Sequence, residues 1–388
     1  MHIVALKSPD SSDHRSVIHP ETIAKLVSLE GASVSFESGI GHGINVSDKA
    51  FAELGLKAIS RDECLSNGDL IITPSSLTLT ESASIKKGST VIGMLNPFYA
   101  VEELKALCNS NISAVSMEFI PRITRAQKMD VLSSQANLAG YAAVLEAAQH
   151  LNSALPMMMT AAGTIPAAKV LVLGAGVAGL QAMATAKRLG AIVSAYDVRA
   201  SSADEVKSMG ATFLDLGLDE VEGAGGYARE MTPERAKAQQ DALKKFISAS
   251  DVVITTAAVP GRKAPTLITT DMMSEMKPGA IIVDLAAESG GNVDGSVAGQ
   301  DVVINVPGGS ITLIGCKDLA SQLAVHASKL YAQNVVSLLT LMTAEGVVTP
   351  DEEDEVVQGS AVVFNGEIRN AMAREALNLP ALATGKGE

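Results

Sequence analysis

The sequence predicts an α/β protein with two Rossmann-like, doubly wound parallel-sheet domains joined by long helices. Short apolar runs alternate with helical segments along most of the chain, which is the pattern of a parallel sheet flanked by helices. One apolar run leads into a G-x-G-x-x-G turn, a helix and a second apolar run. Two segments, 133–151 and 319–344, look like long helices, and we expect them to cross between the domains.

The length of the chain suggests two domains, because 388 residues exceed what a single hydrophobic core usually serves. We expect residues 1–132, completed by 322–388, to form the first domain, and residues 133–321 to form the second. Hydrophobic residues make up 47% of the chain and charged residues 19%, which is enough to bury a large core. Aromatic residues are scarce, and this suits closely packed α/β layers.

The charge and the cysteines exclude several classes of function. A formal net charge of −13 argues against nucleic acid or an anionic membrane as a direct partner. The three cysteines and six histidines are scattered without metal-ligand spacing, so we predict no metal site. The first residues enter an apolar run without the pattern of a signal peptide, and no apolar run approaches the ~20 residues of a membrane span. We expect a cytoplasmic protein with no direct membrane span.

The first domain is predicted from alternating strands and helices. The helical segment 20–29 has a proline in its first turn, and Ser47 is placed to cap the helix that follows it. The strands are expected at 3–6, 34–37, 70–73, 91–95 and 114–119, and the helices at 20–29, 47–54 and 101–108. This domain has no glycine fingerprint of its own. Near the end of the chain, Asn365-Gly366 predicts a hairpin between two short strands.

The glycine turn of the second domain is typical of a dinucleotide site. Residues 170–173 form a buried strand, and Gly174, Gly176 and Gly179 follow it directly before the helix at 180–189. The first glycine permits a tight turn, the second lets the backbone approach a pyrophosphate, and the third lets helix and strand pack closely. The helix N-terminus offers unpaired N–H groups to the phosphates.

Asp197 ends the second strand of this unit, where a carboxylate can accept hydrogen bonds from an adenosine ribose. The same carboxylate would repel a 2′-phosphate, so the sequence favours NAD(H) over NADP(H). Arg199 lies close by and weakens this preference without reversing it.

Further along, residues 155–169 suggest an irregular joint, in which three consecutive methionines at 157–159 indicate adaptable packing. Residues 217–231 form a polar, glycine-rich loop with one tyrosine, and such loops are often functional. Residues 257–261 follow a strand at its carboxyl end, where open α/β sheets bind ligands. The remaining strands of this domain are expected at 192–195, 212–214, 251–256, 280–285, 302–306 and 311–314.

Several segments resemble one family, the NAD(H)-binding domain I, or soluble alpha subunit, of proton-translocating NAD(P) transhydrogenases, within the alanine dehydrogenase/transhydrogenase superfamily. The matching segments include the R-A-Q-x-M-D run and the tyrosine loop: 121–141, 158–182, 225–231, 251–265 and 279–292. The resemblance covers most of residues 110–345. The first 100 residues match more loosely, since Lys7, Arg15 and Val17 remain while the acidic residues beside them are missing.

The resemblance implies a mechanism. This chain would hold NAD(H), and a separate domain on a partner subunit would hold NADP(H). A hydride would pass directly between the two nicotinamides, and a membrane component would couple this step to proton translocation. The enzyme would be active only with its partner subunits, as a homodimer attached peripherally to the cytoplasmic face of the inner membrane. The hairpin or loop segments are candidates for exchange between protomers.

The resemblance also implies site residues. Arg122, Gln127, Asp130 and Ser133 would orient the nicotinamide and its ribose, with Gln127 on the ribose and Arg122 and Asp130 holding the carboxamide end and each other. Tyr227, with Gly226, would lie on a mobile loop that closes over the cofactor. The remaining implied cofactor contacts are Lys128, Met129, Gly174, Gly176, Val177, Gly179, Asp197, Val198, Arg199, Gln239 and Ala258.

Two other functions stay open at this point. An alanine dehydrogenase-like enzyme would need a substrate arginine, a lysine and a catalytic histidine in the first domain. Arg15 could supply the arginine, but the segments at 71–77 and 94–100 hold neither the lysine nor the histidine. A non-catalytic NAD-binding module is the second alternative. The intact R-A-Q-x-M-D run and the tyrosine loop argue against it.

Overall fold

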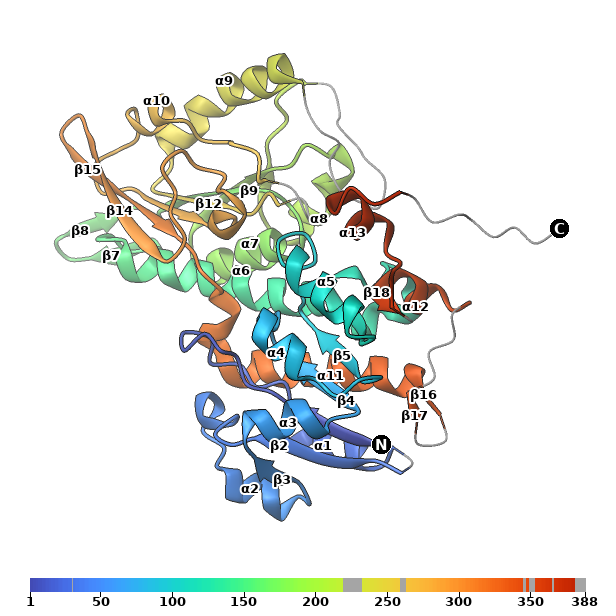
Figure 1. The fold of residues 1–388 in the computed structure, drawn as a ribbon. Helices are drawn as coiled ribbons and strands as arrows, with labels where there is room; N and C mark the ends of the chain where they lie inside the picture. Colours follow the sequence, from blue (N-terminus) through green and yellow to red (C-terminus); the bar gives the residue numbers. More distant parts are fainter. Residues whose placement is uncertain are drawn as a thin grey trace. The chain divides into compact units, whose positions relative to one another are not determined.

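The structure is a computed structural model that describes residues 1–29, 31–218, 232–258, 263–344, 347–348, 353–364 and 366–380. The chain divides into two compact units (Figure 1). Unit 1 combines residues 1–135 with 323–388, and unit 2 comprises residues 136–322. Each unit is built on its own largely parallel sheet, as the sequence predicts.

Unit 1 contains an eight-stranded sheet in the order β19-β18-β6-β5-β4-β1-β2-β3. The six strands from β3 to β6 run parallel, while β18 pairs antiparallel with β6 and β19 antiparallel with β18. The antiparallel pair confirms the predicted C-terminal hairpin. The strands are β1 His2–Ala5, β2 Ser33–Glu37, β3 Lys57–Ile59, β4 Leu70–Thr73, β5 Thr90–Gly93, β6 Ser113–Ser116, β18 Ala361–Phe364 and β19 Glu367–Ile368.

Both faces of this sheet are covered by helices, because its strands are apolar on both sides. Ile3 and Ala5 of β1 belong to one apolar cluster and Val4 to another, so the two clusters lie on opposite faces. The first cluster includes residues of α1, α11 and α12, and the second includes residues of α3, α5 and α13. The helices are α1 Pro20–Val27, α2 Asp48–Glu53, α3 Arg61–Asn67, α4 Leu79–Ser84, α5 Val101–Asn109, α11 Ala324–Met342, α12 Glu355–Ser360 and α13 Ala371–Ala376.

The helix α6, Val131–His150, begins in unit 1 and ends in unit 2. It follows the 3₁₀ segment η3, Thr124–Met129, directly. Within unit 2 the helix packs closely on α7, since a Cβ added at Gly140 would lie 2.1 Å from the carbonyl oxygen of Ala178. Gly140 therefore permits a close helix crossing.

Unit 2 contains a seven-stranded sheet in the order β11-β10-β9-β12-β13-β15-β14. Six strands are parallel, and β14 adds an antiparallel edge beside β15. The order reverses between β9 and β12, and open α/β sheets bind ligands outside the carboxyl ends of the strands at such a point. The strands are β9 Lys169–Leu173, β10 Ile192–Tyr196, β11 Thr212–Phe213, β12 Val252–Thr255, β13 Ile281–Asp284, β14 Gln300–Val306 and β15 Gly309–Gly315.

Helices also cover the sheet of unit 2. Leu243 and Ile247 of α9 and Met272 and Met273 of α10 belong to the same apolar cluster as alternate residues of β9, β12 and β13. The helix α7 contacts β9, β10 and β12 and buries Met183 completely. Its end at Gly190, with φ +88°, agrees with the predicted C-cap. The helices are α7 Val177–Arg188, α8 Ala203–Ser208, α9 Pro233–Ala249 and α10 Thr270–Met273.

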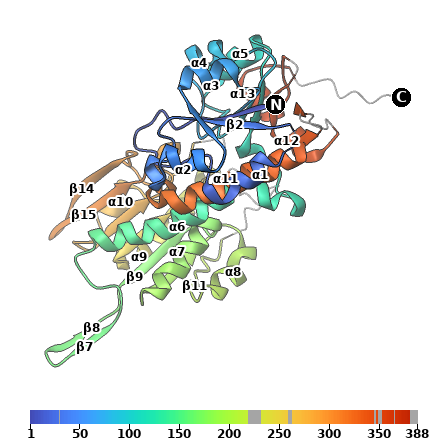
Figure 2. The same ribbon diagram turned by 90° about the horizontal axis from the view of Figure 1, so that it is seen from below.

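The predicted irregular joint at 155–169 is wrong in part, because it contains a regular hairpin. Strands β7, Met158–Thr160, and β8, Gly163–Ile165, pair antiparallel and are exposed along their whole length. Met159 is 78% exposed, so the predicted packing role of the methionines is not seen within unit 2. Figure 2 shows the hairpin projecting from the body of this unit.

No helix in the described part of the chain is both long enough and apolar enough to cross a membrane.

Candidate functional site

The glycine turn between β9 and α7 has the backbone geometry that the sequence predicts. Gly174 has φ +109°, a conformation that residues with a Cβ rarely adopt, and a Cβ there would lie 2.5 Å from Thr256 Oγ1. A Cβ on Gly179 would lie 1.9 Å from the Gly174 carbonyl oxygen. These two glycines are therefore required by the protein itself, whether or not a ligand is bound.

Gly176 differs from its two neighbours in the turn. It caps α7 with φ −78°, and a Cβ added there would meet no atom within 4 Å. Glycine is therefore not needed at this position to close the turn. The open space lies at the first turn of a twelve-residue helix, where backbone N–H groups favour a phosphate. The cradle fits a pyrophosphate, whose close approach to the backbone is the remaining reason for a glycine.

Asp197 directly follows β10 and connects the strand end to the glycine turn. Its Oδ2 accepts a hydrogen bond from the Ala175 backbone N–H at 2.7 Å. Its Oδ1 accepts from the Arg199 backbone N–H and from Arg199 Nε, both at 2.9 Å, and the Arg199 NH2 nitrogen lies 3.1 Å from Oδ2. The carboxylate side chain is 8% exposed, so it is held firmly beside the cradle.

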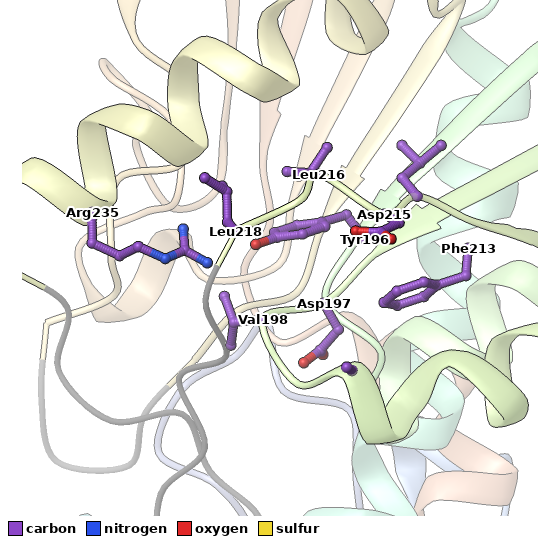
Figure 3. Close-up of a pocket in the computed structure, with 10 residues that line it drawn as sticks. Tyr196, Asp197, Val198, Phe213, Asp215, Leu216, Leu218 and Arg235 are labelled. Atoms are coloured by element: carbon purple, nitrogen blue, oxygen red, sulfur yellow. The ribbon is translucent and has the colours of Figure 1, made fainter.

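A pocket opens next to Asp197 on the same side of unit 2 (Figure 3). Its apolar lining comes from the carboxyl end of β10, from β11 and from the segment after β11. The Arg235 guanidinium of α9 points towards the Tyr196 hydroxyl across the pocket. The lining residues are Tyr196, Asp197, Val198, Ala200, Phe213, Leu214, Asp215, Leu216, Leu218 and Arg235. An apolar pocket with a few polar groups, beside a ribose-binding carboxylate, suits a flat heterocycle such as adenine.

Gln239 does not line this pocket directly. It is 2% exposed, and its side-chain oxygen accepts a hydrogen bond from the Tyr196 hydroxyl at 3.3 Å. Burial raises the pKa of Tyr196 above its ordinary value, against the opposing effect of a hydrogen bond with Arg235. The phenol therefore stays protonated at neutral pH. In unit 2, Gln239 and Arg235 hold the tyrosine that forms the pocket wall.

A buried polar network fixes the carboxyl ends of β12 and β13. Asp284, fully buried, accepts hydrogen bonds from Thr255 Oγ1 at 3.0 Å and from the Asn292 backbone N–H at 2.9 Å. The Asn292 side chain accepts from the Ala257 N–H at 3.0 Å and donates to the Ala257 carbonyl at 2.8 Å. The exposed Ala258, a predicted contact, follows this anchored residue. Sequence reasoning missed the network, although both partners lie in the segment 279–292.

The second group of predicted residues lies in unit 1, on η3 and the start of α6. Arg122, Gln127 and Lys128 have exposed side chains, which leaves them accessible to a ligand. Met129 is 9% exposed and packs into the apolar core of the unit. Its side chain therefore serves the fold, and a cofactor contact there would have to come from its backbone.

Asp130 and Ser133 are brought together as a helix cap. Asp130 Oδ1 accepts from the Ser133 backbone N–H at 2.9 Å, and Oδ2 accepts from the Ser133 hydroxyl at 2.6 Å. This is the arrangement by which an aspartate satisfies free N–H groups at a helix start. The pair therefore sets the direction in which α6 leaves η3.

Two further residues anchor η3 from distant parts of unit 1, and sequence reasoning missed both. Asn334 of α11 donates to the Lys128 carbonyl at 2.8 Å and accepts from the Ser134 hydroxyl at 2.8 Å. Arg125 forms a two-pronged ion pair with Asp354, both distances being 2.8 Å. Neither contact has a sequence signal, because the partners lie about 200 residues apart.

Gly226 and Tyr227 lie outside the described residues. Among the residues that the structure describes, no group of three His, Cys, Asp or Glu side chains is arranged to hold a metal ion.

Family models match both halves of the chain. The model described as "Alanine dehydrogenase/PNT, N-terminal domain" matches residues 7–139, and "Alanine dehydrogenase/PNT, C-terminal domain" matches residues 143–371. The chain belongs to the alanine dehydrogenase/PNT family. This confirms the predicted relationship and explains why a glycine fingerprint occurs in the second unit of a two-unit protein.

Within this family the chain is similar to transhydrogenase subunits over almost its whole length. It is 44% identical over 381 residues to an NAD(P) transhydrogenase subunit alpha chain of Rickettsia prowazekii, covering 97% of this chain and 98% of that one. A crystal structure of a transhydrogenase from Sinorhizobium meliloti matches with a TM-score of 0.83 and 38% identity, covering 96% of this chain and 99% of that one.

An L-alanine dehydrogenase structure has nearly the same fold, with a TM-score of 0.81 over 97% of this chain and 99% of that one, but 19% identity. At that identity the likeness speaks for the fold alone. The higher identity to transhydrogenase subunits agrees with the predicted relationship inside the family.

Proposed function

We propose that this chain is the NAD(H)-binding component of a proton-translocating NAD(P) transhydrogenase. The observation that carries the proposal is its 44% identity over almost its full length to a transhydrogenase alpha subunit. The cradle at Gly176 and the carboxylate of Asp197 add physical support, since together they suit a pyrophosphate and an unphosphorylated ribose.

In unit 2, the residues around the glycine turn bind the adenosine half of the cofactor. The N–H groups at the start of α7 receive the pyrophosphate, and Asp197 accepts hydrogen bonds from the ribose hydroxyls. Val198 and the neighbouring pocket take the adenine. Because two oxygens of a carboxylate can accept about four hydrogen bonds, Asp197 can bind a ribose hydroxyl while keeping Ala175 and Arg199.

In unit 1, the residues of η3 recognise the reactive half. Gln127 hydrogen-bonds the nicotinamide ribose, and Arg122 and Asp130 hold the carboxamide end. NADH supplies the hydride when it is bound, so the protein needs no acid, base or metal for the transfer itself. What these side chains contribute is position, and the anchoring of η3 by Asn334 and Asp354 keeps that position fixed.

The loop that carries Gly226 and Tyr227 is proposed to close over the cofactor and exclude water. Protection of this loop from trypsin by NADH is the expected result. Equal cleavage with and without saturating NADH would overturn this element of the proposal.

The proposal includes partners. NADP(H) is bound by a separate subunit, and a membrane component couples hydride transfer to proton translocation. This chain then associates peripherally with the cytoplasmic face of the inner membrane through those subunits. The name of the Rickettsia relative, a transhydrogenase subunit alpha, agrees with a multi-subunit assembly.

We also propose a homodimer in which the β7–β8 hairpin contacts the second copy. An isolated two-stranded hairpin is marginally stable in water, and this one exposes Met157, Met158, Met159 and Ile165. Methionine side chains adapt readily to an apolar partner surface. Sedimentation velocity is expected to give a dimer for the wild type and a monomer for Met159→Asp. A monomeric wild type at micromolar concentration would contradict the homodimer.

An amino-acid dehydrogenase is less well supported by the strand ends of unit 1. After β4 the chain continues with Pro74, Ser75 and Ser76, and after β5 with Met94, Leu95 and Asn96, so neither end offers a lysine or a histidine. Incubation with L-alanine and NAD⁺ is expected to give no NADH.

The proposed function is tested by mixing. The full chain is combined with an isolated NADP(H)-binding transhydrogenase component, and NADPH or NADH is supplied with an oxidised nucleotide analogue. Activity is expected in the mixture and in neither component alone. Inactivity of the mixture, with both proteins folded and loaded with nucleotide, would overturn the proposal.

A further inference from the structure

Asp197 and Arg199 are locked together at the position where NAD(H) and NADP(H) differ. The Arg199 guanidinium folds back on the carboxylate two residues before it, with Nε 2.9 Å from Oδ1 and NH2 3.1 Å from Oδ2. The arginine side chain is 20% exposed and the aspartate side chain 8% exposed. The pair is therefore largely shielded from water, where ion pairs are stronger than at an open surface.

The same carboxylate is tied to the glycine turn. Its Oδ2 also accepts from the Ala175 N–H at 2.7 Å, and the Arg199 NH2 nitrogen lies 3.4 Å from the Ala175 carbonyl oxygen. Asp197 thus holds the guanidinium beside the cradle while using up its fork of N–H donors. The arginine is close to the ribose position but is committed to another anion.

We propose that Arg199 is a latent ligand for a 2′-phosphate, and that Asp197 excludes NADP(H) partly by withholding this arginine. The inference rests on the proposed function, since it assumes that NAD(H) binds at the glycine turn. Asp197 then acts twice on cofactor choice. Its charge repels a 2′-phosphate, and its two oxygens occupy the guanidinium that would otherwise bind that phosphate in a two-pronged contact.

A structural role for Arg199 leads to a different expectation. If the arginine only stiffened the turn after β10, removing Asp197 would weaken both cofactors, and removing Arg199 from such a variant would make no difference to NADPH. A latent ligand makes the effect of Asp197 on NADPH depend on Arg199. A double-mutant comparison separates the two roles.

The test measures NADH and NADPH affinity of the full chain by nucleotide fluorescence. Asp197→Asn keeps one oxygen that can accept from Ala175 while it removes the charge. We expect it to lower the preference for NADH over NADPH by roughly 10- to 100-fold, the range of a hydrogen bond to a charged group. The double variant D197N/R199A is expected to lose most of the gain in NADPH affinity.

Asp215→Asn is the matched control. Asp215 lines the same pocket and accepts from the Gly217 N–H in its own turn, so its loss removes an equal charge through a different contact. It is expected to leave the NADPH affinity nearly unchanged. An equal gain in D215N, or an unchanged gain in D197N/R199A, would overturn the proposal. Asp197→Ser provides a second test if D197N does not fold.

The failure of the inference can be distinguished from the failure of the proposed function. A wild type that binds NADH, together with a folded D197N that gains nothing for NADPH, would overturn the inference alone. A folded wild type that binds no NADH at all would overturn both.

Discussion

Arg125 and Asp354 lie 229 residues apart in the chain and form a two-pronged ion pair with both distances at 2.8 Å. Arg125 belongs to η3, the segment that carries Gln127, and Asp354 caps α12 by accepting from the Val356 N–H at 2.8 Å. The C-terminal part of unit 1 therefore holds the segment that we propose to position the nicotinamide.

The two roles of Asp354 can be separated by substitution. Asp354→Asn keeps a good helix cap but removes the charge, and we expect it to lower the free energy of unfolding by ~0.2–1 kcal/mol, since Arg125 is 48% exposed. Asp354→Ala removes the cap as well and is expected to cost about 1 kcal/mol more. Urea unfolding measures both. Equal losses for the two variants would contradict the capping role.

Asn334 is expected to contribute both to stability and to NADH binding. It is 6% exposed, and Asn334→Ala leaves the Lys128 carbonyl and the Ser134 hydroxyl without this partner, at a cost of ~1–3 kcal/mol. We also expect weaker NADH binding by the folded variant, because Lys128 follows Gln127 directly. Isothermal titration calorimetry checks the affinity.

Gln333→Ala on the same helix is the control for Asn334. The Gln333 side chain hydrogen-bonds Ser337 and Lys25, which lie outside η3. Its NADH affinity is expected to stay at the wild-type value. If both variants bind NADH equally well, Asn334 does not hold η3 in the position that the cofactor needs.

The three glycines of the turn are expected to separate into two classes. Gly176→Ala meets no atom of the protein, so we expect its unfolding free energy to stay within ~0.5 kcal/mol of the wild type. Its NADH affinity is expected to fall roughly tenfold or more, since a methyl group would fill the space for the pyrophosphate. Gly179→Ala collides with the Gly174 carbonyl and is expected to cost ~1–3 kcal/mol of stability.

Thermal unfolding with and without NADH measures both effects in one experiment. An unstable Gly176→Ala, or one that NADH stabilises as strongly as the wild type, would contradict the cradle.

The sequence predicts the local features of this structure and misses the distant ones. The glycine turn, the α7 C-cap at Gly190 and Asp197 at the end of β10 depend on contacts within about 30 residues, and a pattern reveals these. The Asn334–Lys128 and Arg125–Asp354 contacts depend on how the C-terminal segment folds back, which no local pattern contains. The β7–β8 hairpin is not predicted because Met157–Met159 suggests packing, whereas the strands are exposed.

A pH dependence is expected from Glu81 in unit 1. Burial alone would raise the pKa of Glu81, but hydrogen bonds from Thr78 and Arg61 outweigh it and hold the pKa below the ordinary value of 4.5. The stabilisation is therefore complete above pH 4.5 and is lost as the pH falls through the lowered pKa. Wild-type stability is expected to decrease over this range.

Glu81→Gln tests this directly, because glutamine can keep the capping box with Thr78 while losing the ion pair with Arg61. We expect a loss of ~1–3 kcal/mol at neutral pH and a shallower decline towards acid. Glu63→Gln, in the capping box with Ser60, serves as the control for the capping box alone. Identical acid profiles for wild type and Glu81→Gln would rule out this source of the pH dependence.

The central claim is that the chain holds NADH for direct hydride transfer to a nucleotide on a partner subunit. The most direct measurement supplies NADH deuterated on the transferred side of nicotinamide C4, together with the NADP(H)-binding component and NADP⁺, in ordinary water. We predict that deuterium appears at C4 of the NADPH formed, in stoichiometric yield. NADPH without deuterium, formed at the same rate, would show exchange with solvent and contradict direct transfer.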